Sequence, residues 1–210
     1  MKRLIIVGAG GFGREVLRWA LDMAEYDRDW QIAGFLDDNL HALDDYGVDV
    51  SILGTVQDYQ PGPDDLFAIA VGDPQTRIDL ASTITKRGGC LATLIHPTAV
   101  IGDRVQIGLG SIICPYVVMT CDVTVGSLVI VNVHSTLGHD CKVGAASTLS
   151  CFCDVTGFVE LGEGVFMGSH ATVIPSVKVG HFARIGAGTT VIRNVRAGTT
   201  VFGVPGKQVF

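Results

Sequence analysis

A histidine followed by an aspartate is the pair of side chains in this sequence best suited to proton transfer. Histidine accepts protons near neutral pH. The chain has six histidines, at His41, His96, His134, His139, His170 and His181. His139 follows Gly138 and is followed by Asp140, and a carboxylate beside an imidazole fixes its tautomer and raises its basicity. The sequence predicts His139 as a general base with Asp140 as its partner, the alternative being a solvated pair on a surface turn.

A second group of residues, near the N-terminus, is suited to holding a phosphate. The segment 8–13 fits the pattern G-x-G-x-x-G between a strand and a helix, where backbone N–H groups favour an anion. An acidic pair follows the next apolar run, within reach of a ribose hydroxyl. The substrate-binding candidates are Gly8, Gly10, Gly11, Gly13, Asp37 and Asp38. Nucleotide-sugar binding is favoured over NAD binding or a turn without ligand, because no hydride-transfer domain follows.

The residues around His139 belong to a six-residue repeat. An aliphatic residue recurs at every sixth position from Ile95 to Ala197, and a small or β-branched residue recurs four positions after each. Six is a multiple of the strand period of two, so one large and one small side chain can point inward in every repeat. The pattern predicts a β-solenoid of eighteen hexapeptides without a slip in register. Glycine follows the large residue in ten repeats, where we expect corners with positive φ.

The repeat also predicts which residues lie above one another. With three hexapeptides per coil, residues eighteen positions apart are about 4.8 Å apart. His139 is then one coil from Gly157, which has no side chain to cover its N–H. A proton acceptor beside an amide donor suits attack on a carbonyl, with the donor stabilising the oxyanion. This geometry predicts acyl transfer without a covalent enzyme intermediate. In another column Phe152 separates His134 from His170, which argues against a metal pair.

The first ninety residues alternate predicted strands with predicted helices. Strands are expected at 2–7, 31–36, 51–53 and 66–71, and helices at 14–25 and 76–86. This order is typical of a small Rossmann-like α/β domain with a mostly parallel sheet. We therefore expect 1–92 to form a nucleotide-sugar-binding domain and 93–210 to form an all-β parallel β-helix with a C-terminal cap, which carries the acyl transfer.

Composition excludes several classes of function. A net charge of −6 without a cluster of Lys or Arg argues against nucleic acid or an acidic membrane as partner. No apolar run approaches a membrane span, and the run at 4–7 is far shorter than a signal segment, so we expect a cytoplasmic protein. The six cysteines form no CxxC pair, which predicts buried reduced thiols, with neither disulfides nor a metal site.

Seven segments, in their order along the chain, carry a resemblance to a known family. They are GAGGFGREV (8–16), GFLDD (34–38), IHPTAVIG (95–102), GHDCKVG (138–144), DVTG (154–157), GSHA (168–171) and FGVPGK (202–207). The combination resembles the sugar O- and N-acyltransferases related to the sialic acid O-acetyltransferase and to the bacillosamine-pathway amino-sugar N-acetyltransferases. The resemblance spans essentially the whole chain.

The resemblance implies an assembly and a set of roles. It implies a homotrimer of left-handed β-helices, with acetyl-CoA in the cleft between adjacent solenoids and a nucleotide sugar on the N-terminal domain. The general base falls on His139 and its acidic partner on Asp140. The residues implied to contact acetyl-CoA are Gly157, Ser169 and Ala187. In the N-acetyltransferases of the family a second histidine nine residues after the base positions the acetyl carbonyl, and Thr148 stands there in this chain.

Two hypotheses from different classes of function follow. The first is an acetyl-CoA-dependent acetyltransferase that acts directly, with His139 as general base, on a hydroxyl or amino group of a sugar, nucleotide-linked in the expected case. The second is a noncatalytic trimeric scaffold that binds a nucleotide sugar or CoA. Retention of His139, Asp140 and Gly157 favours the enzyme.

Overall fold

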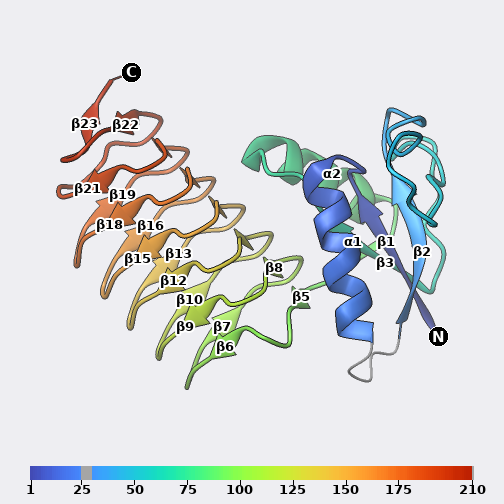
Figure 1. Cartoon of the computed structure of the whole chain (residues 1–210), viewed down its shortest axis with the longest axis horizontal. Coiled ribbons are helices and arrows are strands. Elements are labelled where there is room, and N and C mark those ends of the chain that lie inside the picture. Colours follow the sequence, from blue (N-terminus) through green and yellow to red (C-terminus); the bar gives the residue numbers. More distant parts are fainter. Residues whose placement is uncertain (25–29, 210) are drawn as a thin grey trace. The chain divides into compact units, whose positions relative to one another are not determined.

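The computed structural model describes residues 1–24 and 30–209. The chain divides into two compact units, Met1–Leu94 and Ile95–Phe210. Figure 1 shows the first unit as a sheet with helices and the second as a stack of short strands. The predicted fold class, an α/β domain followed by a parallel β-helix, is confirmed.

The first unit is a four-stranded parallel sheet with two helices. In spatial order its strands are β2 (Trp30–Leu36), β1 (Lys2–Val7), β3 (Asp65–Ile69) and β4 (Cys90–Leu91), and its helices are α1 (Gly11–Ala24) and α2 (Pro74–Lys86). The strand expected at 51–53 is reduced to one bridge, between Ile52 and Phe35. The helix end predicted at Glu25 lies outside the described residues.

Local signals explain why α2 begins two residues earlier than predicted. The side chain of Asp73 accepts a hydrogen bond from the N–H of Thr76, and Pro74 follows as the first helical residue. An aspartate cap followed by proline is a strong helix start. The apolar residues of β1, Leu4 to Val7, are at most 1% exposed, and they form the centre of this unit's core.

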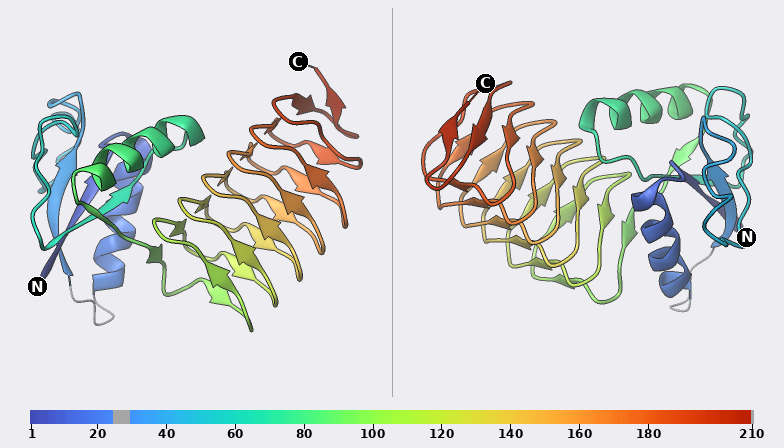
Figure 2. Two further views of the ribbon diagram at one scale, coloured as in Figure 1. Left: turned by 180° about the vertical axis from the view of Figure 1, so that it is seen from behind. Right: turned by 45° about the horizontal axis from the view of Figure 1, so that its top comes forward.

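The second unit consists of three parallel sheets that form the sides of the solenoid (Figure 2). Sheet I contains β5 (Leu94–Ile95), β8 (Ile112–Ile113), β11 (Ile130–Val131), β14 (Thr148–Leu149), β17 (Phe166–Met167), β20 (Arg184–Ile185) and β22 (Thr200–Phe202), with β23 (Lys207–Gln208) antiparallel at its end. Sheet II contains β6 (Val100–Ile101), β9 (Val118–Met119), β12 (Thr136–Leu137), β15 (Asp154–Val155), β18 (Thr172–Val173) and β21 (Thr190–Val191). Sheet III contains β7 (Gln106–Ile107), β10 (Thr124–Val125), β13 (Lys142–Val143), β16 (Glu160–Leu161) and β19 (Lys178–Val179).

The core of the solenoid follows the two predicted columns. Thr136 pairs with Asp154 and Leu137 with Val155, the predicted spacing of eighteen residues. Leu137 and Val155 are fully buried, as is Cys141 of the small column. Buried serines of the small column donate to carbonyls, Ser111 to Gly126 at 3.0 Å, Ser135 to Ser150 at 3.0 Å and Ser147 to Gly162 at 2.9 Å. These hydrogen bonds offset the cost of removing the hydroxyls from water.

The corner glycines have a different role from the predicted one. Gly138, like most glycines that follow a large residue, does not have a positive φ. A Cβ at Gly138 would lie 2.7 Å from the backbone N of Gly157 in the next coil, so glycine is required there by close approach. The positive φ falls two residues later, at Asp140 with φ 59°, the third residue of a type II turn. The other non-glycine residues with positive φ are Arg104, Tyr116, Asp122, Leu128, His134, Ala146, Phe152, Phe158, His170, Ser176 and Phe182.

The regular repeat ends one hexapeptide earlier than predicted. Val179 pairs with Val195, and Ile185 pairs with Val201, in each case sixteen residues apart. The prediction of an unbroken register is therefore wrong, and Ala197 lies exposed in a turn. In the shortened coil the side chain of Asn194 accepts a hydrogen bond from the N–H of Lys178 at 2.9 Å, and Val195 pairs with Val179 in the place that the pattern gave to Ala197.

The cysteines are all free, but only half of them are buried. Cys114, Cys141 and Cys153 are buried, Cys121 and Cys151 are half-buried, and Cys90 is exposed. The prediction of buried thiols is wrong for the last three, and position in an inward column does not by itself decide burial, since Cys114 lies outside both columns and is buried. Desolvation raises the pKa of Cys141 and of Cys153 to about 12, which keeps both thiols protonated and unreactive.

Candidate active site

His139 lies at the II–III corner, the set of turns that join sheet II to sheet III. It follows β12 in the turn of residues 138–141. Its Nδ1 is 2.9 Å from Oδ2 of Asp140, and the two side chains are 53% and 44% exposed. A carboxylate on Nδ1 favours the tautomer with its proton there. Nε2 is then the atom with a free lone pair, the one that can accept a proton.

The imidazole of His139 lies across Gly157 of the next coil. A Cβ at Gly157 would be 2.7 Å from Nε2 and 2.8 Å from Cε1 of the ring. The ring of Phe158 meets the imidazole edge-on, with centroids 5.1 Å apart at 87°. Gly157 is therefore buried, although the sequence indicated an open position. The spacing of eighteen residues found the right neighbour but not the direction of the ring.

The amide N–H of Gly157 is available as a donor. Among the described residues it donates no hydrogen bond, whereas the Gly157 carbonyl accepts the N–H of Ser176 at 3.1 Å. The neighbouring N–H, of Phe158, donates to the His139 carbonyl at 3.0 Å. The Cα of Gly157, next to this N–H, faces Nε2 of His139. A group that can accept a proton and an unbonded N–H thus lie on neighbouring residues, the pair of groups that attack on a carbonyl would use.

A second acidic residue, which the sequence reasoning missed, lies one coil before Asp140. The guanidinium of Arg104 forms a bidentate ion pair with the carboxylate of Asp122. Its Nε donates to Oδ1 at 2.6 Å and its Nη2 donates to Oδ2 at 2.7 Å. This pairing holds the pKa of Asp122 below its ordinary value. Arg104 therefore neutralises Asp122, and Asp140 is left as the carboxylate bound to the imidazole. The spacing of eighteen residues along this column could have identified the pair.

The other residues expected at acetyl-CoA lie at a different corner of the solenoid. Ser169 and Ala187 follow β17 and β20 at the I–II corner, the set of turns that join sheet I to sheet II. The structure thus brings His139, Asp140 and Gly157 together but does not bring Ser169 or Ala187 to them within one chain. Thr148, at the position of the family's second histidine, is 5% exposed in β14.

The glycine loop of the first unit is open at its centre. Gly10 and Gly11 are exposed, and a Cβ at either would meet nothing within 4 Å. Gly13 allows close packing, because a Cβ there would lie 1.9 Å from the carbonyl oxygen of Gly8. Gly8 itself has φ 97°. The loop has the geometry of an anion cradle at the start of α1.

Asp37 holds this loop in place. Its Oδ2 accepts a hydrogen bond from the N–H of Ala9 at 2.7 Å, and its Oδ1 accepts one from the N–H of Asn39 at 2.8 Å. A carboxylate oxygen has lone pairs left for a ribose hydroxyl, but the loop contact is the one the structure contains. Asp38, beside it, is exposed. The two acidic residues therefore differ in role, a distinction that the sequence did not indicate.

Two arginines support the same unit. Arg14, in the first turn of α1, stacks its guanidinium over the Tyr46 ring at 3.5 Å. Arg77 is fully buried and donates to the carbonyl of Val71 at 2.5 Å, and burial lowers its pKa to about 10. Val71 in turn lies beside Gly8. Arg77 therefore fixes the segment that borders the glycine loop.

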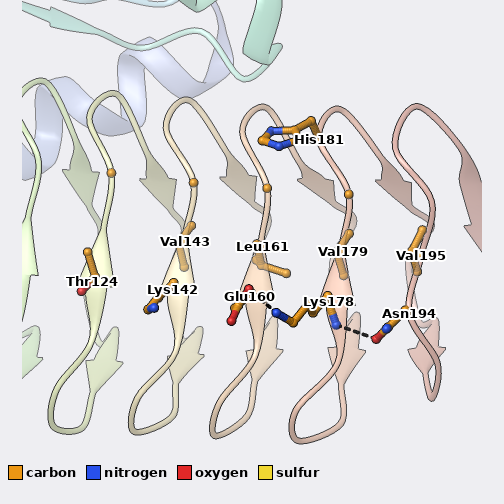
Figure 3. Close-up of a pocket in the computed structure, with 14 residues that line it drawn as sticks. Thr124, Lys142, Val143, Glu160, Leu161, Lys178, Val179, His181, Asn194 and Val195 are labelled. Atoms are coloured by element: carbon orange, nitrogen blue, oxygen red, sulfur yellow. Dashed lines mark hydrogen bonds and ion pairs between the residues drawn. The ribbon is translucent and has the colours of Figure 1, made fainter.

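A groove of about 490 Å³ runs along sheet III, apart from the His139 corner. Figure 3 shows Lys142, Glu160 and Lys178 along one side of it and His181 on the other. Lys178 forms an ion pair with Glu160 at 2.9 Å, which holds the pKa of Glu160 below its usual range. None of the predicted catalytic residues lines this groove.

Two kinds of site are absent from the described residues, 1–24 and 30–209. No group of three or more His, Cys, Asp or Glu side chains among them could hold a metal ion. None of the helices in these ranges is long and apolar enough to span a membrane.

Comparison with known proteins covers both units of the chain. Residues 3–84 match the PglD N-terminal domain family. The chain is 28% identical to a GDP-perosamine N-acetyltransferase from Escherichia coli O157:H7, over 97% of this chain and 95% of that protein. PerB from Caulobacter crescentus, solved in complex with CoA and GDP-perosamine, is 28% identical with a TM-score of 0.89 over 100% of this chain and 98% of its own. The acetyltransferase domain of PglB from Neisseria gonorrhoeae FA1090, solved with acetyl coenzyme A, is 28% identical with a TM-score of 0.87 over 99% of each chain.

Proposed function

We propose that this protein transfers an acetyl group from acetyl-CoA to a nucleotide-linked sugar, because it is similar over nearly its whole length to named sugar N-acetyltransferases. The observation that carries the proposal is the His139 imidazole, which is bound to Asp140 and packs against Gly157, a residue whose N–H makes no hydrogen bond among the described residues. The acceptor is an amino group in the favoured case, since the relatives are named as N-acetyltransferases. A cytoplasmic location belongs to the proposal, because acetyl-CoA and nucleotide sugars are cytoplasmic metabolites.

The residues at the corner divide the reaction between them. Nε2 of His139 takes the proton from the acceptor nitrogen or oxygen as that atom attacks the thioester carbonyl. The Gly157 N–H donates to the carbonyl oxygen, on which negative charge develops. When the tetrahedral intermediate collapses, the carbon–sulfur bond breaks and CoA leaves as the thiolate, which the imidazolium can protonate. Asp140 stabilises the imidazolium between these two steps.

Release of CoA thiol tests the proposal directly. The purified protein is incubated with acetyl-CoA and a panel of GDP-, UDP- and dTDP-linked amino and hydroxy sugars, and free thiol is measured. We expect thiol release that depends on an amino-sugar nucleotide, with the N-acetylated sugar as product by mass spectrometry. Binding of CoA or of a nucleotide sugar without thiol release, across the panel, would favour the noncatalytic scaffold instead.

The placement of the acetyl-CoA residues supports a trimer. His139 is half exposed at one end of sheet II, and Ser169 and Ala187 are at the other end. One acetyl-CoA can contact both corners only if a second copy presents its I–II corner to the first copy's II–III corner. Such contacts repeat around a closed ring. The outward residues of sheet II suit a central face, since they are small or β-branched with one acid: Val100, Val118, Thr136, Asp154, Thr172 and Thr190.

We expect the protein to have three times the 22.2 kDa mass of the chain in solution. Thr172→Arg, on the outward face of sheet II, should produce monomers and abolish thiol release, because a bulky charge would be buried at the centre of the assembly. Thr124→Arg, at the equivalent position of sheet III, is the matched control and should stay trimeric. Light scattering measures both. A fully active wild-type monomer at micromolar concentration would refute the trimer.

The nucleotide is assigned to the first unit, at 8–13 and the acidic pair. Asp37→Ala should weaken nucleotide-sugar binding by about tenfold or more, the usual worth of charge-assisted hydrogen bonds, because the N–H of Ala9 loses its anchor. Binding of acetyl-CoA should not change, which titration calorimetry with each ligand can check. Asp44→Ala, an exposed acid of the same unit that pairs with His41, is the control. Tight binding of NADH with no affinity for nucleoside diphosphates would restore the dinucleotide interpretation.

A further inference from the structure

Four aromatic rings form a stacked ladder along the I–II corner. Tyr116, His134, Phe152 and His170 lie eighteen residues apart, and successive ring centroids are 4.9, 4.9 and 4.8 Å apart with planes inclined by 12°, 10° and 2°. The spacing matches that of the coils. All four residues are exposed and have φ between 58° and 61°. The corner thus presents parallel rings to solvent at fixed intervals.

The backbone of the ladder continues for one more coil, but the ring does not. Gly188 is the next member of the column, with φ 67°. Its N–H donates to the Ser169 carbonyl at 2.9 Å, just as the N–H of His170 donates to Cys151 at 3.0 Å. A Cβ at Gly188 would meet nothing within 4 Å. The space beside His170, on the side opposite Phe152, is therefore free of a side chain from the ladder.

We propose that this fifth rung binds the adenine ring of acetyl-CoA, stacked on the imidazole of His170. The inference rests on the proposed function, which brings acetyl-CoA to this corner. Ser169 precedes His170, and Ala187 precedes Gly188, so the two residues expected at acetyl-CoA flank the rung. Adenine is the one aromatic ring of acetyl-CoA, and the nucleobase of the sugar substrate is assigned to the first unit. A planar base is stabilised by stacking on an aromatic side chain.

The position of the rung agrees with the length of the ligand. Gly188 is less than two coils from Gly157, roughly 10 Å along the solenoid axis. The flexible pantetheine and diphosphate arm that joins adenine to the thioester can cover this offset and the cleft between two copies. The ladder therefore adds a recognition element at one end of acetyl-CoA, while His139 acts at the other.

Comparison of two acetyl donors isolates the adenine contact. Acetyl-pantetheine carries the same thioester as acetyl-CoA but has neither adenine nor diphosphate. His170→Ala should raise KM for acetyl-CoA about tenfold, within the worth of one stacked base, and leave KM for acetyl-pantetheine and both kcat values unchanged. His170→Phe should restore the acetyl-CoA value. His181→Ala removes an exposed histidine at another corner and is the matched control.

A second variant fills the rung. Gly188→Phe places a ring in a backbone conformation that Phe152 already adopts, at φ 59°. It should raise KM for acetyl-CoA and spare acetyl-pantetheine, with a circular dichroism melting curve like that of the wild type. Equal changes with both donors, or no change with acetyl-CoA in either variant, would overturn the proposal.

Failure of the proposed function gives a different result. In that case wild-type protein releases no thiol from either donor with any acceptor. Titration of CoA and of pantetheine into wild type and His170→Ala then tests the rung alone. A loss of affinity confined to CoA supports it, and equal affinities of the two proteins for CoA overturn it.

Discussion

His139→Ala should lower kcat by about two to four orders of magnitude, the usual contribution of a general base. The Kd of acetyl-CoA should change little, because the donor's assigned contacts are at Gly157, Ser169 and Ala187. Without the imidazole, the acceptor must lose its proton to water as it attacks. Asp140→Asn should have a milder effect, since the ring keeps a neighbour at Nδ1 but loses the charge that stabilises the imidazolium. Initial rates of thiol release and a titration with CoA measure the two effects separately.

The first unit provides a matched control for this pair. Nδ1 of His41 is 2.9 Å from Oδ2 of Asp44, the same distance as between His139 and Asp140, and both side chains are well exposed. His41→Ala removes the same pair of groups from the first unit, and it should leave kcat unchanged. If His139→Ala kept more than about a third of the turnover, the base would lie elsewhere. His134 would then be the next residue to substitute.

Much of the β-helix could be predicted because its period is set by side chains that point inward. The large residues from Ile95 to Val191 repeat without error, and β5 to β21 follow them. The end of the pattern could not be predicted from aliphatic character alone. Ala197 fits the six-residue pattern, yet the last coil is shorter than eighteen residues. In this coil the side chain of Asn194 accepts a hydrogen bond from the N–H of Lys178. Val195 rather than Ala197 pairs with Val179, and the period alone cannot choose between two aliphatic residues so close in the sequence.

The corners show a similar limit. Glycine after the large residue suggested positive φ, but at Gly138 the requirement is the approach of the next coil. Bulky residues such as Phe152 occupy the positive-φ position instead. Stacking along the column and the hydrogen bonds between coils offset a strain of about 1 kcal/mol or more for each such residue. Those contacts form only when coils assemble, so the local sequence does not reveal them.

The sequence predicts which residues of the candidate site are neighbours, but it does not predict how their side chains are oriented. The spacing of eighteen residues placed Gly157 beside His139, and the structure agrees. It could not show that the imidazole turns toward Gly157, because that depends on a rotamer held by Asp140 and Phe158. The role of Asp37 as the anchor of Ala9 also depends on a contact between separate strands.

The orientation of the imidazole changes what substitution of Gly157 should do. A Cβ there would lie 2.7 Å from Nε2 of His139, closer than two such atoms can approach. Gly157→Ala should therefore push the ring aside, and Gly157→Val should displace it further and narrow the path to the N–H. We expect kcat for Gly157→Val to fall about a hundredfold, the usual cost of misplacing a catalytic group by 1 Å. The solenoid should stay folded, because the inward columns are unchanged and the corner is at the surface.

A double-mutant cycle decides whether Gly157 acts through His139. If the new side chain works by displacing the imidazole, Gly157→Val should cost little further activity once His139→Ala has removed the ring, and the two losses should not add. If the full loss recurs in the His139→Ala background, the valine blocks the acetyl group itself. Circular dichroism melting curves for all four proteins exclude unfolding as the cause. A Gly157→Val protein with normal KM and kcat would show that the acetyl group does not pass this corner, and the assignment of His139 would then be lost with it.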